Sequence, residues 1–186
     1  MRPNLFLARV LYGNSNNIVN FASRVINQRN LQSMNNQFSP KISEVLIYSK
    51  EEALRLHNEC VAPEHLLLGL IRDGEGKAIQ ILRLLNLDFR SVKLRAEQSI
   101  QGSAMQEMPD ADHEIILNEK ASKIMRLCLL EARMLKAQVA DTEHILLAIM
   151  KEKDNNACRI LEENSIHYTD ILNLLTQKAE KSDVQS

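Results

Sequence analysis

The chain of 186 residues is poor in the residues that build turn-rich β proteins: it has no Trp, 4% aromatic residues, five Gly and four Pro. β-sandwiches and barrels need many tight turns and strands rich in β-branched and aromatic residues, so this shortage argues against them. The chain is instead rich in Leu, Ile, Ala, Glu, Lys and Arg, which favour helices. Its length is sufficient to bury a substantial core. The composition therefore predicts an all-α protein of one compact domain or two small ones.

The sequence also lacks an excess of charge of one sign, because 23 Lys and Arg oppose 24 Asp and Glu. The resulting net charge of −1 creates no field that would attract nucleic acid or an anionic membrane. No run of apolar residues approaches the ~18 that a membrane-spanning helix needs. We therefore expect neither nucleic acid nor a membrane among its partners.

The three cysteines, Cys60, Cys128 and Cys158, are too scattered for a disulfide framework or a CxxC metal site. Cys60 and Cys158 align with Val139 and Ile79 in the repeat described below. We therefore interpret the three cysteines as apolar core residues in a reducing compartment. The five His have no metal-ligand spacing. An enzyme that uses Cys60 or Cys128 as a nucleophile is an alternative, but nothing in the spacing favours it.

A nucleotide site requires a Gly-rich loop that ends in Gly-Lys followed by Ser or Thr. The stretch GLIRDGEGKA comes nearest, since Gly69 and Gly74 have the required spacing. Glu75 stands where the Lys is needed, however, and its carboxylate would repel phosphate, so we interpret the stretch as a turn. The sequence also lacks the HExxH motif of metalloproteases and the GxSxG motif of serine hydrolases. We therefore expect no catalytic residue, metal site or cofactor in this chain.

The first 33 residues contain four Arg and no acidic residue, the first carboxylate being that of Glu44. This composition is typical of an organellar transit peptide. Alternatively, Met34 is the functional start, because MNNQFSPKISEVL leads directly into the first helical pattern. We favour the second interpretation, with a disordered extension before Met34 and a cytoplasmic protein; a transit peptide would place the protein in an organelle.

The chain contains an internal repeat. Residues 40–96 align with residues 119–175 without a gap, at a constant offset of 79 residues. A fixed offset over a whole unit is the signature of duplication. The identical pairs are Lys41/Lys120, Ser43/Ser122, Glu52/Glu131, Ala53/Ala132, Leu56/Leu135, Glu64/Glu143, His65/His144, Leu67/Leu146, Leu68/Leu147, Ala78/Ala157, Ile81/Ile160 and Leu82/Leu161.

Each unit is predicted to form four helices. Apolar residues recur at helical spacing from Ile42 to Leu56, with Ser39 as N-cap and Pro40 in the first helical position. The stretches HLLLGLI and HILLAIM are apolar on nearly all sides, which predicts that these two helices are central. We therefore expect two tandem four-helix repeats that form one pseudo-twofold globule of eight helices. The expected helices cover residues 40–56, 63–72, 77–86 and from about 88, then 119–136, 142–152, 156–164 and 168–180.

The expected organisation follows from the repeat. An extension is followed by the first repeat, a connecting loop without helical period, the second repeat and a polar tail. Their expected boundaries are 1–33, 34–102, 103–116, 117–180 and 181–186.

The paired EHLLLGL and EHILLAI helices resemble the Clp N-terminal repeat, which heads the Clp/Hsp100 AAA+ unfoldases. The resemblance is to the ClpC branch throughout the stretch KEEALRLHNECVAPEHLLLGLIRDGEGKAIQILRLLNLD. It covers about residues 38–177. It implies a monomeric domain without catalytic activity that receives substrates and adaptor proteins, for degradation by a ClpP-type peptidase. ATP and Mg would belong to ATPase modules absent from this chain, which is then a fragment or an adaptor-like protein. A stand-alone helical interaction protein unrelated to proteolysis is the alternative.

Glu64 and Glu143 have two interpretations. A carboxylate in the first turn of a helix is stabilised by the helix dipole, by ~0.3–1 kcal/mol. The resemblance implies a second role, because in ClpC-type domains of some bacteria the matching Glu binds the guanidinium of phosphoarginine. The phosphate then lies near the start of the first helix of the same repeat. The implied residues are Glu64 and Glu143 on the guanidinium side, and Ser39, Lys41, Asn118 and Lys120 on the phosphate side.

The chain departs from the ClpC pattern at this site. The residue before the Glu is usually Thr, which Thr142 keeps and Pro63 does not. The Thr on the phosphate side is replaced by Ser39 and Asn118. If only one site binds, we favour the groove of Glu64. The adjacent His65 and His144 are interpreted as partly buried packing residues that bond to a neighbour.

Overall fold

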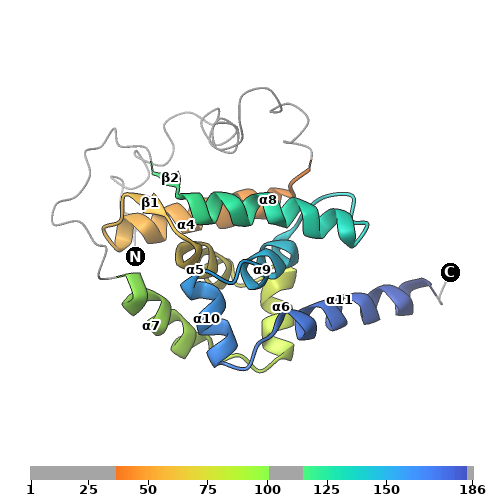
Figure 1. Ribbon diagram of the computed structural model, residues 1–186. Helices are drawn as coiled ribbons and strands as arrows, with labels where there is room; N and C mark the ends of the chain where they lie inside the picture. Colours follow the sequence, from red (N-terminus) through yellow and green to blue (C-terminus); the bar gives the residue numbers. More distant parts are fainter. Residues whose placement is uncertain (1–36, 101–114, 184–186) are drawn as a thin grey trace, which may run out of the picture.

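The computed structural model of the chain describes residues 37–100 and 115–183 (Figure 1). The predicted extension, most of the predicted loop and residues 184–186 lie outside the described residues. All eight predicted helices are present, which confirms the all-α class. The elements are α4 (Pro40–Arg55), β1 (Cys60–Val61), α5 (Pro63–Asp73), α6 (Lys77–Leu84), α7 (Phe89–Ile100), β2 (Ile116–Leu117), α8 (Glu119–Met134), α9 (Thr142–Lys151), α10 (Asn156–Glu163) and α11 (Tyr168–Asp183).

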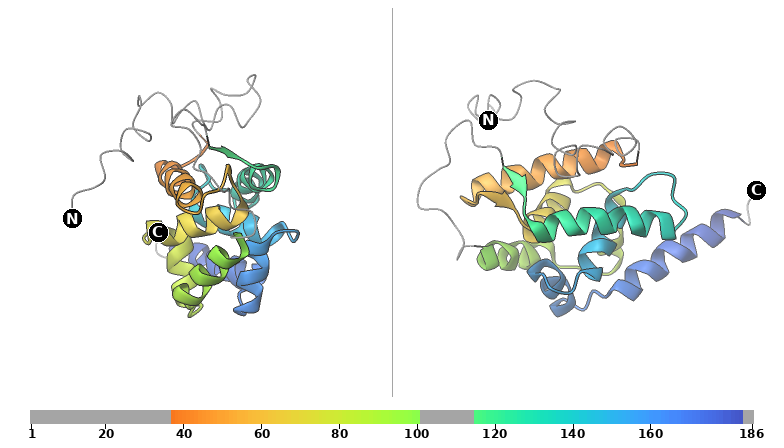
Figure 2. Two further views of the ribbon diagram at one scale, coloured as in Figure 1. Left: turned by 90° about the vertical axis from the view of Figure 1, so that its left-hand side faces the viewer. Right: turned by 45° about the horizontal axis from the view of Figure 1, so that its top comes forward.

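The helices form three layers, and a pseudo-twofold axis relates the two repeats (Figures 1 and 2). Helices α4 and α8, the first of each repeat, lie side by side in one outer layer. Helices α5 and α9 form the middle layer, and α6, α7, α10 and α11 form the other outer layer. Helix α4 packs on α5 as α8 packs on α9, and the short helices cross over, since α6 packs on α9 and α10 on α5.

The two middle helices hold the core, as their sequences predicted. Leu67 of α5 and Leu146 of α9 have no exposed surface, and their neighbours Leu66 and Leu147 have none either. Full burial of each such side chain stabilises the fold by about 1.5–3 kcal/mol. Because α5 and α9 are covered on all sides by helices of both repeats, the two repeats share one core.

Two short backbone pairings join the repeats. Strand β1 pairs in parallel with β2, with Val61 opposite Leu117, and an isolated parallel bridge joins Phe38 to Ala140. The offset of 79 relates these two pairings to each other. In both, the residues before the first helix of one repeat pair with those before the second helix of the other. The prediction of a loop to residue 116 was therefore wrong at its end, where Ile116 belongs to β2.

The helix starts follow the predicted caps. The Oγ atom of Ser39 accepts a 3.3 Å hydrogen bond from the backbone amide of Ile42, and Oδ1 of Asn118 accepts one of 2.9 Å from Ala121. These side chains satisfy amides that have no partner within the helix.

Four helix ends share one geometry. His57 and Lys136 have positive φ angles of 56° and 55°, and Asn86 and Ser165 have 58° and 61°. Each of these residues is followed by one whose amide bonds back across the last turn, as Asn58 does to the carbonyl of Ala53 at 2.9 Å. This arrangement is the Schellman motif. The four positions form two pairs related by the offset of 79. The backbone conformation at these positions is therefore the same in both repeats, although the residue types differ.

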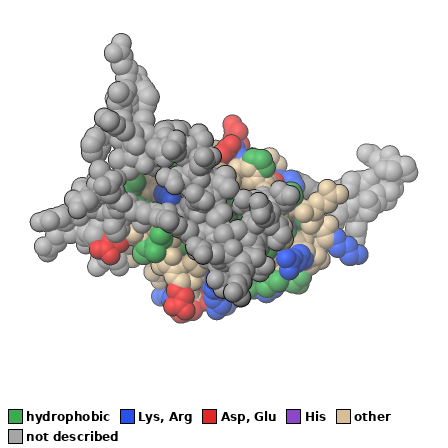
Figure 3. Space-filling model, turned by 90° about the horizontal axis from the view of Figure 1, so that it is seen from above, with side chains coloured by type: hydrophobic (Ala, Val, Ile, Leu, Met, Phe, Trp, Pro, Cys, Tyr) green, Lys and Arg blue, Asp and Glu red, His purple; other side chains and the backbone are tan. Residues whose placement is uncertain are grey.

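The surface has no gathering of charge in the view of Figure 3. Where the described residues are visible on that face, Lys and Arg are interspersed with Asp and Glu. Among the described helices, none combines the length and the apolar character required to cross a bilayer.

Candidate functional site

A pocket of about 480 Å³ opens where the starts of α5, α8 and α10 meet. Glu64, the second residue of α5, lies in its wall and is 6% exposed. Helix α5 belongs to the first repeat, whereas α8 and α10 belong to the second. The pocket therefore exists only when both repeats are folded together. The residues that matter for its chemistry are Glu64, His65, Asn118, Lys120, Asn156 and Arg159.

The convergence of three helix starts gives the pocket its electrostatic character. Each helix N-terminus presents amide N–H groups and the positive end of its dipole, which together favour an anion. Lys120 and Arg159 add two cationic side chains. The Lys120 Nζ lies 3.0 Å from Oδ2 of Asp154 in an exposed ion pair. Among the described residues, none forms a hydrogen bond or an ion pair with the guanidinium of Arg159.

The carboxylate of Glu64 is also without a partner. Within residues 37–100 and 115–183, no group donates a hydrogen bond to it. Its oxygens are not among the buried, unpaired atoms, unlike Oε2 of Glu143, so a cation or donor that enters the pocket can reach them. The site therefore offers an acceptor for a cation beside helix starts that favour an anion.

The predicted site residues are brought together across the repeats rather than within them. Asn118 and Lys120 line the pocket of Glu64. Ser39 lies instead beside the start of α9, where its Oγ atom donates a 2.8 Å hydrogen bond to Oδ1 of Asp141. Neither Ser39 nor Lys41 lines the pocket of Glu64, and Nζ of Lys41 lies 2.8 Å from Oδ1 of Asp73. The exchange of strands described above explains this grouping, because it places the start of each first helix beside the start of the second helix of the other repeat.

His65 forms a fixed part of the pocket wall. Its Nδ1 accepts a 2.9 Å hydrogen bond from the amide of Ala62, so the proton is on Nε2, which donates to Oδ1 of Asn58 at 3.0 Å. His144 accepts the equivalent bond from Asp141 at 2.9 Å. Burial lowers the pKa of His65 to about 4. Both His were predicted to pack and to bond to a neighbour; the structure confirms this and buries them almost completely, at 1% and 3% exposed.

Glu143 has different surroundings. The Nζ atom of Lys77, the first residue of α6, donates a 3.0 Å hydrogen bond to its Oε1. Its Oε2 is buried and has no partner among the described residues. The start of α6 also presses on α9, since Oγ1 of Thr142 accepts a 3.2 Å bond from the amide of Ala78. A Cβ added to Gly76 would lie 2.6 Å from that same oxygen, so the approach requires Gly.

Comparison with known proteins agrees with this fold. The family described as the Clp repeat (R) N-terminal domain matches residues 37–164. The chain belongs to this family.

Relatives of this Clp N-terminal domain include much longer proteins. The "Negative regulator of genetic competence ClpC/MecB" of Bacillus subtilis strain 168 is 37% identical over 125 residues, which is 67% of this chain and 15% of that protein. Among solved structures, the Hsp104 N-terminal domain from Candida albicans has a TM-score of 0.61 at 16% identity, and covers 75% of this chain and 89% of its own. A chain from "structural investigations of a malarial protein secretion system" has a TM-score of 0.70 at 18% identity, and covers 81% and 99%.

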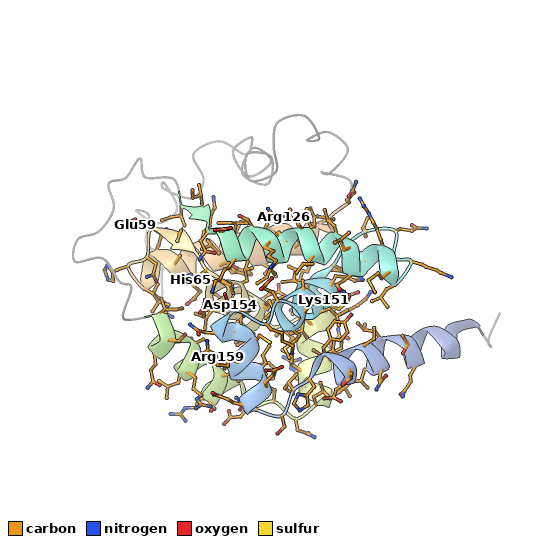
Figure 4. The ribbon with its side chains drawn as sticks, in the orientation of Figure 1. Glu59, His65, Arg126, Lys151, Asp154 and Arg159 are labelled. Carbon is orange, nitrogen blue, oxygen red and sulfur yellow. The ribbon has the colours of Figure 1, made fainter. Side chains whose placement is uncertain are left out.

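Sequence reasoning missed two pocket residues of this Clp N-terminal domain, Asn156 and Arg159. Their counterparts at the offset of 79 are Lys77 and Gln80, so the search for conserved pairs passed over them. Figure 4 shows Arg159 of α10 and His65 of α5 toward the end of the molecule where β1 and α7 lie. These two residues could have been found by comparing the positions at which the two repeats differ.

The other acidic residue that both repeats share, Glu52 in the first and Glu131 in the second, has a structural role. Glu52 accepts hydrogen bonds from Arg55 and Arg72. Glu131 accepts from Nζ of Lys151 at 2.6 Å and from the Tyr168 hydroxyl at 2.8 Å, and burial together with this bond raises the pKa of Tyr168 to about 12. Both carboxylates are thereby neutralised inside the fold.

The thiols and the metal-binding residue types can be placed for the described part of the chain. Cys128 and Cys158 are buried core residues, as predicted, but Cys60 is only partly buried and lines the pocket. Burial raises the pKa of Cys60, which keeps it a protonated thiol and disfavours a role as nucleophile. The described part of the chain has no group of three or more His, Cys, Asp or Glu that could hold a metal ion.

Proposed function

We propose that this chain is a docking domain that receives substrate proteins and adaptors for a Clp-type ATP-dependent unfoldase. The observation that carries the proposal is the pocket at Glu64, in which an unpaired carboxylate of one repeat faces two helix starts of the other. A pocket lined by polar side chains and helix starts suits a charged group on another protein. Family membership and the similarity to the longer ClpC protein support delivery to an ATPase as the purpose of docking.

The charged group that fits best is phosphoarginine on a substrate protein. Its guanidinium can donate two parallel hydrogen bonds to the Glu64 carboxylate. Its phosphate can then lie against the starts of α8 and α10, near Lys120 and Arg159. Asn118 caps α8 with Oδ1, and its amide group remains available as a donor. In this arrangement the ligand bridges the repeats.

Calorimetric titration of the full chain with phosphoarginine, with arginine as the control ligand, tests the proposal. We expect binding that requires the phosphate, that is lost in Glu64→Gln and that is weakened in Arg159→Gln. The Gln of the second variant is the residue that the other repeat carries at this place, so the helix should tolerate it. Binding that persists in Glu64→Gln would place the ligand elsewhere. No binding to the folded wild type would exclude phosphoarginine, and adaptor docking would then be tested alone.

A further inference from the structure

The two repeats differ at the residue that faces each duplicated carboxylate. Lys77 is the first residue of α6 and lies 3.0 Å from Glu143. The residue related to it by the offset of 79 is Asn156, the first residue of α10, which lines the pocket of Glu64. One duplicated carboxylate therefore contacts a cation of its own chain, and the other shares its pocket with a neutral amide.

The surroundings of Glu143 also disfavour an anion. Asp141 stands where the first repeat has Ala62, and it accepts the hydrogen bond of Ser39 at the start of α4. A phosphate bound in the manner proposed for the pocket of Glu64 would approach this carboxylate. The close contact between Gly76 and Thr142 further narrows the approach.

The pairing of Lys77 with Glu143 is incomplete. Glu143 is 4% exposed, and only Oε1 has a partner while Oε2 is buried without one. An ammonium group is a single point charge, whereas a guanidinium presents two parallel donors to both oxygens of a carboxylate. A single ammonium group therefore leaves Oε2 unpaired, whereas a guanidinium could donate to both oxygens.

We propose that Lys77 occupies the Glu143 site as an internal cation, so that the domain has one open site for a guanidinium ligand, at Glu64, and one that is closed by its own chain. The nature of the ligand at the open site rests on the proposed function. The self-occupation of Glu143 does not, because it depends only on contacts within the chain. The bond to Glu143 also raises the pKa of Lys77.

Exchanging the two residues between the repeats tests the inference. Lys77→Asn should open the site of Glu143, and Asn156→Lys should close the site of Glu64. The readout is the side-chain carboxylate signal of each Glu in carbon-detected NMR of the full chain. Two probes separate the two questions: phosphoarginine, and methylguanidinium, which carries the cation without the phosphate that Asp141 repels.

In the wild type we expect phosphoarginine to shift the Glu64 signal and to leave that of Glu143 in place. In Lys77→Asn, methylguanidinium should shift the Glu143 signal. In Asn156→Lys, the affinity for phosphoarginine should fall by about tenfold or more, because the new lysine competes for Glu64. Thermal melting of each variant checks its fold, and Lys77→Gln serves if Lys77→Asn does not fold.

Two results would overturn the inference: a Glu143 signal that responds in the wild type as strongly as that of Glu64, or no response of Glu143 to methylguanidinium once Lys77 is removed. Failure of the proposed function looks different. Phosphoarginine would then leave Glu64 unchanged in the wild type, while the response of Glu143 in the Lys77 variant would still decide the inference.

Discussion

The backbone amide of Ser39 donates a 2.8 Å hydrogen bond to the carbonyl of Ala140, and the amide of Asn118 donates one of 2.9 Å to Val61 at the equivalent place. The residue before the first helix of each repeat is thus hydrogen-bonded to the backbone of the other repeat. The same exchange brings α10 onto α5 and α6 onto α9. Each repeat covers only part of its own central helix, and helices of the other repeat cover the rest.

Residues 34–102 expressed alone should therefore be largely unfolded. Without the second repeat, α5 would expose side chains such as Leu66 and Leu67, which have no exposed surface in the whole domain. Circular dichroism and amide NMR dispersion of the fragment check this. Mixing it with residues 103–186 should restore helicity, and a cooperative melt of residues 34–102 alone would contradict the prediction.

Leu67→Asp and Leu146→Asp should each unfold the domain. Both side chains are fully buried, and an unpaired carboxylate there would cost at least about 4 kcal/mol, most of the stability of an ordinary domain. Thermal melting followed by circular dichroism is the measurement. Leu84→Asp is the matched control, since Leu84 is 56% exposed and its variant should melt with the wild type.

His65 should make stability depend on pH. Its pKa is about 6.5 in the unfolded chain and is lowered to about 4 in the fold. The unfolded chain therefore takes up the proton first. Stability is complete above pH 6.5 and falls as the pH drops toward 4, by about 3 kcal/mol at 1.36 kcal/mol per pKa unit.

Urea unfolding between pH 7 and pH 4.5 checks this dependence. His65→Gln should reduce this dependence, because Gln at this position can still accept the amide of Ala62 and does not titrate, while burial also lowers the pKa of His144, which continues to contribute. His167→Gln is the control, since His167 is exposed. An equal loss of stability in the wild type and in His65→Gln would show that other groups cause the pH dependence.

Gly69→Ala should destabilise the domain. An added Cβ would lie 2.7 Å from the carbonyl oxygen of Val45 and 3.0 Å from the backbone amide of Ser49, so α4 and α5 would have to separate. Such overpacking costs about 1–3 kcal/mol, more than the helix propensity gained from Ala. The second repeat has Ala148 at this place, fully buried, so Ala148→Gly measures the propensity effect together with the loss of one buried methyl group. An unchanged urea midpoint for Gly69→Ala would contradict the prediction.

The helices could be predicted because their information is local. The spacing of Ile42, Val45 and Leu46 defines a buried stripe, and Ser39 and Asn118 mark starts by chemistry that acts within one turn. The contact of each repeat with the other could not be predicted in the same way. A two-residue strand such as β1 carries no periodic signal, and its partner is decided by how the whole repeats pack.

The candidate site shows the same division. The sequence predicted Glu64, Asn118 and Lys120 as binding residues. It could not predict that they line one pocket, because that depends on the exchange between the repeats. Arg159 and Asn156 were missed because duplication draws attention to what the halves share. At this site the informative positions are those at which they differ.

The four Schellman ends carry residues other than Gly at positive φ, namely His57, Asn86, Lys136 and Ser165. A left-handed residue with a Cβ is strained, and Gly at such a place should raise stability by about 0.5–1 kcal/mol after its greater freedom in the unfolded chain is subtracted. Asn86 should gain least, because Asn tolerates this conformation. None of the four lines the pocket or belongs to the buried core. The thermal tolerance of this domain can therefore be adjusted without replacing a residue that lines the pocket.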